Sequence, residues 1–273
     1  MSGVAPIENS HIAFAGELAD AARRLLAEFA GDPLAVDVKP DRSLVTQMDM
    51  MIETRLREMI AARFPDHGII GEEQDWDRAG AHAVWVLDPI DGTAAFIAGM
   101  PVYGTLIALA IDGVPRLGII DIPAIDARWI GAEGRPTTRN GETVRVRPCP
   151  DLSRSILTNS NQDYLSAAER PVLERLRRVT GNRVYGGASL NYGLLATGRT
   201  DIALDSGQKV FDFAPFRPII EGAGGIVTDW EGKPLSLESG GSVLAAGDAA
   251  RHREVLDIIA EVFSDTQQET LAG

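Results

Sequence analysis

Two stretches in the first part of the chain carry apolar residues at every third or fourth position. One runs from about residue 10 to residue 29, and the other from residue 45 to residue 64. This spacing places the apolar side chains on one face of an α-helix, so each stretch is predicted to form a helix with one buried side. Asn9 or Ser10 can cap the first helix, and Pro40, within residues 39–43, predicts a turn before the second.

From residue 83 the pattern changes to short apolar runs that suit β-strands. The run at 83–87 is apolar and partly β-branched, which is typical of a strand buried on both faces. Further strand-like runs stand at 105–109, 117–120 and 128–130, and the pattern continues to about residue 147. Turn signals such as Asp112-Gly113 and Asn140-Gly141 separate these runs. Consecutive strands joined by short turns predict an antiparallel sheet.

From residue 155 onward, strand-like and helix-like patterns alternate. Strands are predicted at residues 155–158, 183–185, 202–204, 225–228 and 243–246, and helices at about residues 166–179, 190–196, from 212 and at 249–263. This alternation is typical of an α/β arrangement, in contrast with the first half. We therefore predict an N-terminal subdomain, residues 1–148, and a C-terminal α/β subdomain, residues 149–273, with one active site in the cleft between them.

The composition is that of a globular protein. The 273 residues are 45% hydrophobic and 24% charged, which is enough for a substantial core. No run approaches the roughly 18 apolar residues of a membrane span, and the N-terminus does not resemble a signal peptide, so a cytoplasmic location is predicted. The formal charge of −13 argues against nucleic acid as the main ligand. The single cysteine, Cys149, excludes an internal disulfide.

Two acidic residues, Asp88 and Asp91, stand where the strand predicted at 83–87 stops, and Thr93 can cap a short helix over residues 94–98. Free N–H groups at a helix start attract a phosphate, but neighbouring carboxylates would repel it unless cations lay between them. Mg²⁺ suits this role, because it prefers oxygen ligands and is commonly shared with substrate phosphate oxygens. The alternative interpretation is an Asp-Pro turn followed by a second acid that caps a helix.

Three motifs resemble those of the inositol monophosphatase family, which comprises Mg²⁺-dependent, lithium-sensitive phosphomonoesterases. They are Gly71-Glu72-Glu73, the segment Asp88–Thr93, and Asp212 followed by the segment Glu221–Gly225. The resemblance covers nearly the whole chain and implies a layered αβαβα sugar-phosphatase fold. It also implies two or three Mg²⁺ ions per site. The implied metal ligands are Glu72, Asp88, Asp91, Asp212 and the Ile90 carbonyl, and the implied phosphate-binding residues are Asp91, Gly92 and Thr93.

The same resemblance implies catalytic roles for Glu72, Thr93 and Asp49. Glu72 and Thr93 would orient a water molecule that attacks the phosphorus in line, and Asp49 would hydrogen-bond Thr93. From the residues alone, Asp49 and Glu53 are one helical turn apart and are as easily two exposed acids. Similarly, Asp212 alone is an ordinary helix cap.

Histidines contribute no predicted chemistry. His67 and His82 flank turns, where histidines are more often exposed than catalytic.

Within the family, the segments 103–109 and 218–225 and Lys209 resemble the histidinol-phosphatase branch. The chain departs from that branch at residues 187–190, which read Gly-Ala-Ser-Leu in place of Gly-Asp-Cys-Tyr, and at Asp205, where glutamate is usual. Asn191 is instead similar to inositol monophosphatases proper. The expected substrate is therefore L-histidinol phosphate, as in histidine biosynthesis, with inositol 1-phosphate or another polyol or nucleotide phosphate as the alternative. The expected substrate contacts are Asp205, Ser189, Asn191 and Lys209.

The expected partner is thus a small phosphate ester, and the chain is predicted to form a homodimer. A regulatory protein that kept the fold without catalysis is a second class of function. That class would be expected to show a broken set of metal-binding carboxylates, whereas the set here is complete.

Overall fold

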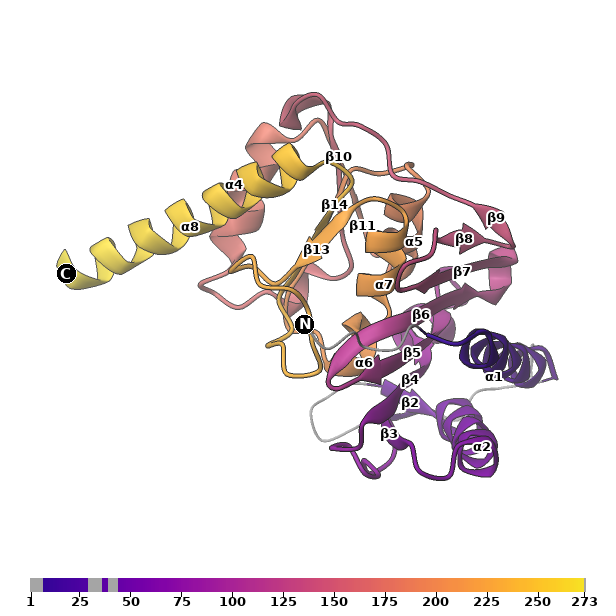
Figure 1. The fold of residues 1–273 in the computed structure, drawn as a ribbon. Coiled ribbons are helices and arrows are strands. Elements are labelled where there is room, and N and C mark those ends of the chain that lie inside the picture. The colour runs from indigo at the N-terminus through magenta and orange to yellow at the C-terminus, as the bar shows by residue number, and fades with distance from the viewer. Residues whose placement is uncertain (1–6, 29–35, 39–43, 273) are drawn as a thin grey trace.

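The computed structural model describes residues 7–28, 36–38 and 44–272. Helices and sheets alternate in five layers, as Figure 1 shows. Helices α1 (Asn9–Glu28) and α2 (Gln47–Arg63) cover the outer face of the larger sheet. Three helices lie between the two sheets: α5 (Leu190–Ala196), α6 (Val210–Phe213) and α7 (Phe216–Gly222). Helices α4 (Arg170–Val179) and α8 (Ala249–Ala272) form the fifth layer. This is the predicted αβαβα fold.

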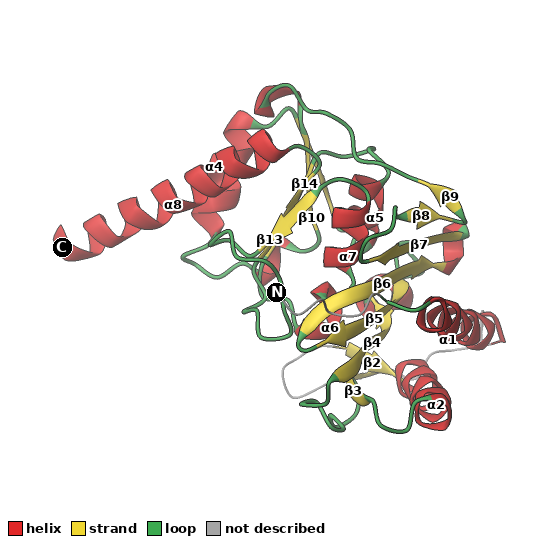
Figure 2. Ribbon diagram, viewed as in Figure 1, coloured by secondary structure: helices red, strands yellow, loops and turns green. Residues whose placement is uncertain are grey.

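The larger sheet has seven strands in sequence order, and all of them precede residue 148 (Figure 2). They are β3 (Gly68–Gly71), β4 (Ala83–Asp91), β5 (Gly104–Ile111), β6 (Val114–Ile122), β7 (Ala127–Ala132), β8 (Thr138–Arg139) and β9 (Glu142–Thr143). Every neighbouring pair from β4 to β9 is antiparallel, as predicted. The β3–β4 pair is parallel. An antiparallel arrangement therefore does not hold at this edge, which is where Glu72 follows β3.

The smaller sheet follows the order β11-β10-β12-β14-β13. Its strands are β10 (Ile156–Asn159), β11 (Asn182–Tyr185), β12 (Ile202–Asp205), β13 (Ile226–Thr228) and β14 (Val243–Ala246). Strand β10 runs parallel to both β11 and β12, whereas β14 is antiparallel to its two neighbours. The loops that follow β10, β11 and β12 therefore leave the sheet at the same edge.

Strand β4 is buried on both faces, which explains its nearly continuous apolar run. On its outer face, Trp85 packs edge-on against Phe14 of α1, with ring centroids 5.5 Å apart. Trp85 Nε1 also donates a hydrogen bond to His67 Nδ1 at 3.1 Å. His67 is therefore half-buried and not exposed as expected, and burial lowers the pKa of its imidazole. His82 is exposed, in agreement with the expectation.

The helices between the sheets approach the larger sheet closely because glycines stand at the contacts. A Cβ atom on Gly118 of β6 would lie 2.3 Å from the carbonyl oxygen of Pro215, and one on Gly131 of β7 would lie 2.4 Å from Ile219 Cα. Any side chain at either glycine would therefore push α7 away from the sheet. This contact fixes the C-terminal half against the N-terminal half.

Most elements agree with the sequence predictions to within a few residues. The two N-terminal helices and the strand at 243–246 are confirmed, whereas α4 begins at Arg170 and not near residue 166, and α8 continues to Ala272 and does not end near residue 263. The turn predicted at 39–43 lies outside the described residues; it would join β1 (Val36–Val38) to β2 (Leu44–Thr46), which pair in antiparallel fashion. None of the helices in the described ranges has the length and apolar character needed to cross a bilayer.

Candidate active site

Strand β4 does not stop at Leu87 as predicted but continues to Asp91 with a break in its ladder. Its pairing with β5 shifts register between Asp88 and Asp91. Pro89 has no N–H to donate to the ladder, and its carbonyl accepts a hydrogen bond from Thr105 Oγ1 at 2.8 Å. A regular strand would point Asp88 and Asp91, which are three residues apart, to opposite faces, whereas the extra residue opposite β5 brings them to the same face.

Gly92, not Thr93, occupies the N-cap position of helix α3 (Thr93–Ile97). The Gly92 backbone is left-handed, with φ of 79°, a conformation that glycine adopts without a steric penalty. The predicted side-chain cap is therefore wrong: Thr93 Oγ1 turns back and donates to the carbonyl oxygen of Ile90 at 3.1 Å. This hydroxyl and this carbonyl are thereby held together at the start of α3.

Glu72 follows β3, and its amide donates to the Leu87 carbonyl at 3.2 Å. The next turn is held by the fully buried carboxylate of Glu53 on α2. Glu53 Oε2 accepts the Glu73 amide at 2.8 Å, and Oε1 accepts the Gln74 amide at 3.1 Å. Arg57 on the same helix pairs with Glu53 Oε1 at 2.8 Å. Glu53 therefore fixes the backbone directly after a predicted metal ligand.

Gly71 makes this clamp possible. A Cβ atom at this position would lie 2.2 Å from Glu53 Oε1. The glycine of the Gly71-Glu72-Glu73 motif is thus required by the approach of a buried carboxylate.

The C-terminal half contributes Asp212 from helix α6, which packs against β4 and β5. Asp212 stands in the first turn and not at the cap; Lys209 is the N-cap residue, and its amide donates to Asp212 Oδ2 at 2.6 Å. The same half also holds Asp91, because the Ser189 amide donates to Asp91 Oδ2 at 2.7 Å. Both halves therefore position the carboxylates.

Charges of one sign gather at this point. Burial first, and then the charges of Glu72 and Asp91, raise the pKa of Asp88 well above its ordinary value. Burial likewise raises the pKa of Asp91 to about 6, although the Ser189 amide favours its charged form. The pKa of Asp212 is also raised, mainly by burial. Without a cation, this cluster costs folding free energy.

In the described ranges, no group of three acidic, histidine or cysteine side chains is gathered tightly enough to hold one metal ion. The chemistry of the cluster nevertheless fits a hard divalent cation. Asp88 Oδ1 is buried and has no hydrogen-bond partner among the described residues. An oxygen-only donor set of several carboxylates is the set that Mg²⁺ prefers. Glu72, Asp88, Asp91 and Asp212 would hold it.

Asp49 lies in the first turn of α2 and is fully buried, like Glu53 one turn later. The alternative of two exposed acids is therefore wrong for both residues. The Thr93 hydroxyl donates its hydrogen bond to the Ile90 carbonyl oxygen and not, as predicted, to Asp49. The catalytic roles of Asp49 and Thr93 stay predictions.

Asp205, the expected contact for the substrate alcohol, is buried at the end of β12 with both oxygens engaged. Oδ1 accepts the Ser160 amide at 2.7 Å and the Asn159 side-chain amide at 3.0 Å. Oδ2 accepts the hydroxyls of Ser160 at 2.9 Å and Tyr192 at 2.8 Å. Burial raises the pKa of Asp205 to about 7. Four hydrogen-bond donors of the chain therefore occupy the carboxylate that was expected to bind the substrate alcohol.

The other expected substrate contacts lie near the cluster. Ser189 and Asn191 are buried, and Ser189 Oγ and Asn191 Nδ2 have no hydrogen-bond partners among the described residues. Lys209 is exposed and lies next to Asp212 through its amide. These positions stay compatible with substrate binding.

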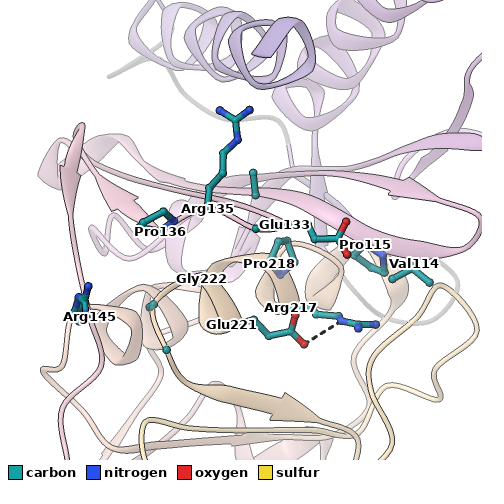
Figure 3. A pocket seen from close by; sticks show the side chains of 14 residues that line it. Val114, Pro115, Glu133, Arg135, Pro136, Arg145, Arg217, Pro218, Glu221 and Gly222 are labelled. Atoms are coloured by element: carbon teal, nitrogen blue, oxygen red, sulfur yellow. Dashed lines mark hydrogen bonds and ion pairs between the residues drawn. The ribbon is translucent and has the colours of Figure 1, made fainter. Parts of the chain in front are cut away.

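A cavity of about 380 Å³ between β6, β7 and α7 contains none of the predicted site residues. Figure 3 shows that its arginines do not converge. Arg217 pairs with Glu221 at 3.1 Å, and Arg135 turns away to donate to Asn9 Oδ1 at 2.6 Å. Arg145 lies at the far side. The acidic cluster, and not this cavity, is the candidate active site.

Known proteins share this arrangement along nearly the whole chain. A model of the inositol monophosphatase family matches residues 8–268. The chain belongs to this family. It is 41% identical over 249 residues to the "Bifunctional phosphatase IMPL2, chloroplastic" of Arabidopsis thaliana, with 88% of this chain and 72% of the relative covered. It is 35% identical over 239 residues to a histidinol-phosphatase of Chlorobaculum parvum, with 86% and 92% covered.

A solved inositol monophosphatase of Zymomonas mobilis has the same fold, with a TM-score of 0.85 and 40% identity over 92% of this chain and 98% of the other. The chain is therefore a phosphatase of the inositol monophosphatase family.

Sequence reasoning missed two features of this candidate site in a phosphatase of the inositol monophosphatase family. The role of Glu53 had a signal, because Glu53 and Asp49 lie in the same helical stripe as the buried Ile52 and Leu56. The donors around Asp205 had no comparable signal, because Ser160 belongs to the loop after another strand and its contact depends on strand order.

Glu53→Gln should weaken Mg²⁺ binding about tenfold, because an amide cannot accept all the hydrogen bonds that hold the turn after Glu72. Isothermal titration with Mg²⁺ measures this directly, without substrate. Glu58→Gln, at an exposed position of the same helix, is the matched control and should bind Mg²⁺ like the parent. Parental affinity in Glu53→Gln would show that the clamp serves folding alone.

Asp91→Asn should stabilise the metal-free protein at pH 8 while lowering activity on the order of 10³-fold. Because the folded-state pKa of Asp91 is raised to about 6, its charge is unfavourable above that pH, and the cost is relieved as pH falls through 6 towards 4. We expect a gain on the order of 1–3 kcal/mol in chelator.

Thermal melting with chelator and then with Mg²⁺ checks this expectation. Mg²⁺ should raise the melting temperature of the parent more than that of Asp91→Asn. Asp163→Asn, at an exposed carboxylate, should change neither melt. A lower metal-free melting temperature for Asp91→Asn would contradict the electrostatic account.

Proposed function

We propose that the protein is a Mg²⁺-dependent phosphomonoesterase that hydrolyses a small phosphorylated alcohol, most suitably L-histidinol phosphate. One observation carries the proposal: buried and half-buried carboxylates from both halves gather beside the backbone amides that open α3. A phosphate dianion approaching Gly92 and Thr93 would be repelled by this cluster unless cations intervened. The site therefore suits a phosphate ester only in its metal-loaded form.

Several residues around the acidic cluster would take part in this reaction. The amides of Gly92 and Thr93 would bind phosphate oxygens, and Asp91, held by Ser189, would keep its orientation. Glu72, on the turn fixed by Glu53, would accept the proton of an attacking water. When bound, Mg²⁺ supplies charge neutralisation at the phosphate and acidifies a coordinated water.

Two relatives support histidinol phosphate as the substrate. Both are named histidinol-phosphatase, one from Chlorobaculum parvum and one from Mycobacterium tuberculosis, and each is 35% identical to this chain. The solved inositol monophosphatase at 40% identity supports the alternative, inositol 1-phosphate. The occupied carboxylate of Asp205 bears on this choice, since a direct ion pair with the ammonium of histidinol phosphate would require one of its four donors to move.

The parent protein should hydrolyse histidinol phosphate with Mg²⁺ and lose this activity in chelator, with recovery when Mg²⁺ is restored. Released phosphate is measured for histidinol phosphate, inositol 1-phosphate and adenosine 3′,5′-bisphosphate, and kcat/KM ranks them. Lithium at roughly tens of millimolar should inhibit by competing with Mg²⁺. Turnover that survives thorough metal removal would overturn the metal-dependent mechanism, and a higher kcat/KM for inositol 1-phosphate would transfer the assignment to the polyol.

The homodimer and the cytoplasmic location expected from the sequence stay predictions. Strand β11 is the edge of the smaller sheet, and all four of its residues are exposed, with Val184 at 50%. An unpaired edge with an exposed apolar residue is a surface on which a second copy can pair.

If β11 forms the dimer, light scattering after gel filtration should give twice the chain mass for the parent and the monomer mass for Val184→Lys. Val114→Lys, at a partly exposed position of the larger sheet, should leave the dimer intact. A monomeric parent would refute the dimer, and a dimeric Val184→Lys would place its interface elsewhere.

A further inference from the structure

The loops after three parallel strands converge on the acidic cluster. After β11, the Ser189 amide holds Asp91, and after β12, the Lys209 amide holds Asp212. Because β10 is parallel to both strands and lies between them, its following loop leaves the sheet at the same edge. Ser160, the first residue of that loop, is already fixed to the end of β12 through Asp205. The loop after β10 is therefore a third wall of the site.

Tyr164 is the aromatic residue of this wall. It ends the short 3₁₀ helix η3 (Gln162–Tyr164), and its side chain is 62% exposed. A Cβ atom on Gly207 would lie only 3.4 Å from the Tyr164 Cβ. Gly207 stands two residues before Lys209, whose amide holds the carboxylate of Asp212. Tyr164 thus packs against the segment that delivers a predicted metal ligand.

The electrostatics agree with this position. Partial burial of the hydroxyl, followed by the charges of Asp212 and Asp91, raises the pKa of Tyr164. The Asn161 side chain caps the same 3₁₀ helix, since its Oδ1 accepts the Asp163 amide at 3.0 Å. The tyrosine therefore stands on a capped turn, and most of its side chain is open to solvent beside the cluster.

An exposed aromatic ring at the rim of a phosphatase site suits a leaving group that contains a planar ring. A planar ring can stack on it, and a cationic planar ring gains further attraction from the π-face. A polyol offers neither a planar face nor a charge. Asp205 presents no free oxygen, so recognition beyond the phosphate does not start with a direct ion pair there.

We propose that Tyr164 is a specificity-determining residue that stacks on the planar, imidazole-bearing leaving group of the substrate and favours it over a polyol. This inference rests on the proposed phosphomonoesterase function and deepens it. It assigns the choice of alcohol to the loop after β10, apart from the residues that hold phosphate and metal.

The test compares Tyr164→Ala and Tyr164→Phe with the parent on histidinol phosphate, inositol 1-phosphate and glycerol 2-phosphate at saturating Mg²⁺. Tyr164→Ala should raise KM for histidinol phosphate about tenfold with kcat within about twofold, because it removes binding common to the ground and transition states. The two polyol esters should change less than about twofold, and Tyr164→Phe should retain the preference. Ile125→Ala removes an exposed apolar side chain from the turn after β6 and is the control, expected to behave as the parent.

Two results would overturn the inference: an equal loss for all three esters in Tyr164→Ala, or an unchanged KM for histidinol phosphate. Circular dichroism and the kcat for glycerol 2-phosphate report whether the variant is folded and metal-loaded. If the parent hydrolyses none of the esters with Mg²⁺, the proposed function itself has failed. If the parent is active and Tyr164→Ala still prefers histidinol phosphate, only the role assigned to Tyr164 is wrong.

Discussion

The structure depends on holding several carboxylates together in a place where water screens them only in part. Asp88 is buried, and its neighbours Glu72, Asp91 and Asp212 carry the same sign of charge. Such a cluster opposes folding on its own, so the surrounding chain must supply the stability that the cluster removes. Two close-packed sheets and three helical layers provide that support. The same gathering of negative charge would attract cations to the site.

The supports reach the cluster from different directions. Glu53 on α2 holds the turn after Glu72, and the register shift in β4 brings Asp88 and Asp91 to the same face of the strand. In the other half, close contact of α7 with Gly131 fixes the helical layer against the larger sheet. No single element therefore carries the site, and its geometry depends on the packing between halves. A displacement of α7 would move Asp212 relative to β4.

Local patterns predicted the elements well because each depends on nearby residues. Helix α5 and strand β14 could be located from spacing and turn signals alone, whereas the three acidic motifs were joined into one site by their resemblance to a family. Contacts between distant segments could not. The four donors around Asp205 come from strand β10, its loop and helix α5, and only the strand order brings them together.

The reversal at Thr93 illustrates a second limit, since a threonine before an apolar run predicts a cap. The left-handed backbone of Gly92 instead takes the cap position, and the threonine hydroxyl bonds backwards to Ile90. Chain direction at such a turn depends on one backbone angle that residue types alone leave open.

The hydrogen bond from Ser189 to Asp91 crosses from one half of the molecule to the other. Its donor is a backbone amide, so substitution of the Ser189 side chain cannot remove it. The strength of this hydrogen bond depends on whether the Asp91 carboxyl group is protonated or carries a negative charge. The amide resonance of Ser189 should therefore act as a built-in spectroscopic reporter of the charge state of the opposite half. Its hydrogen-exchange rate would follow occupancy of the site even when no substrate is present.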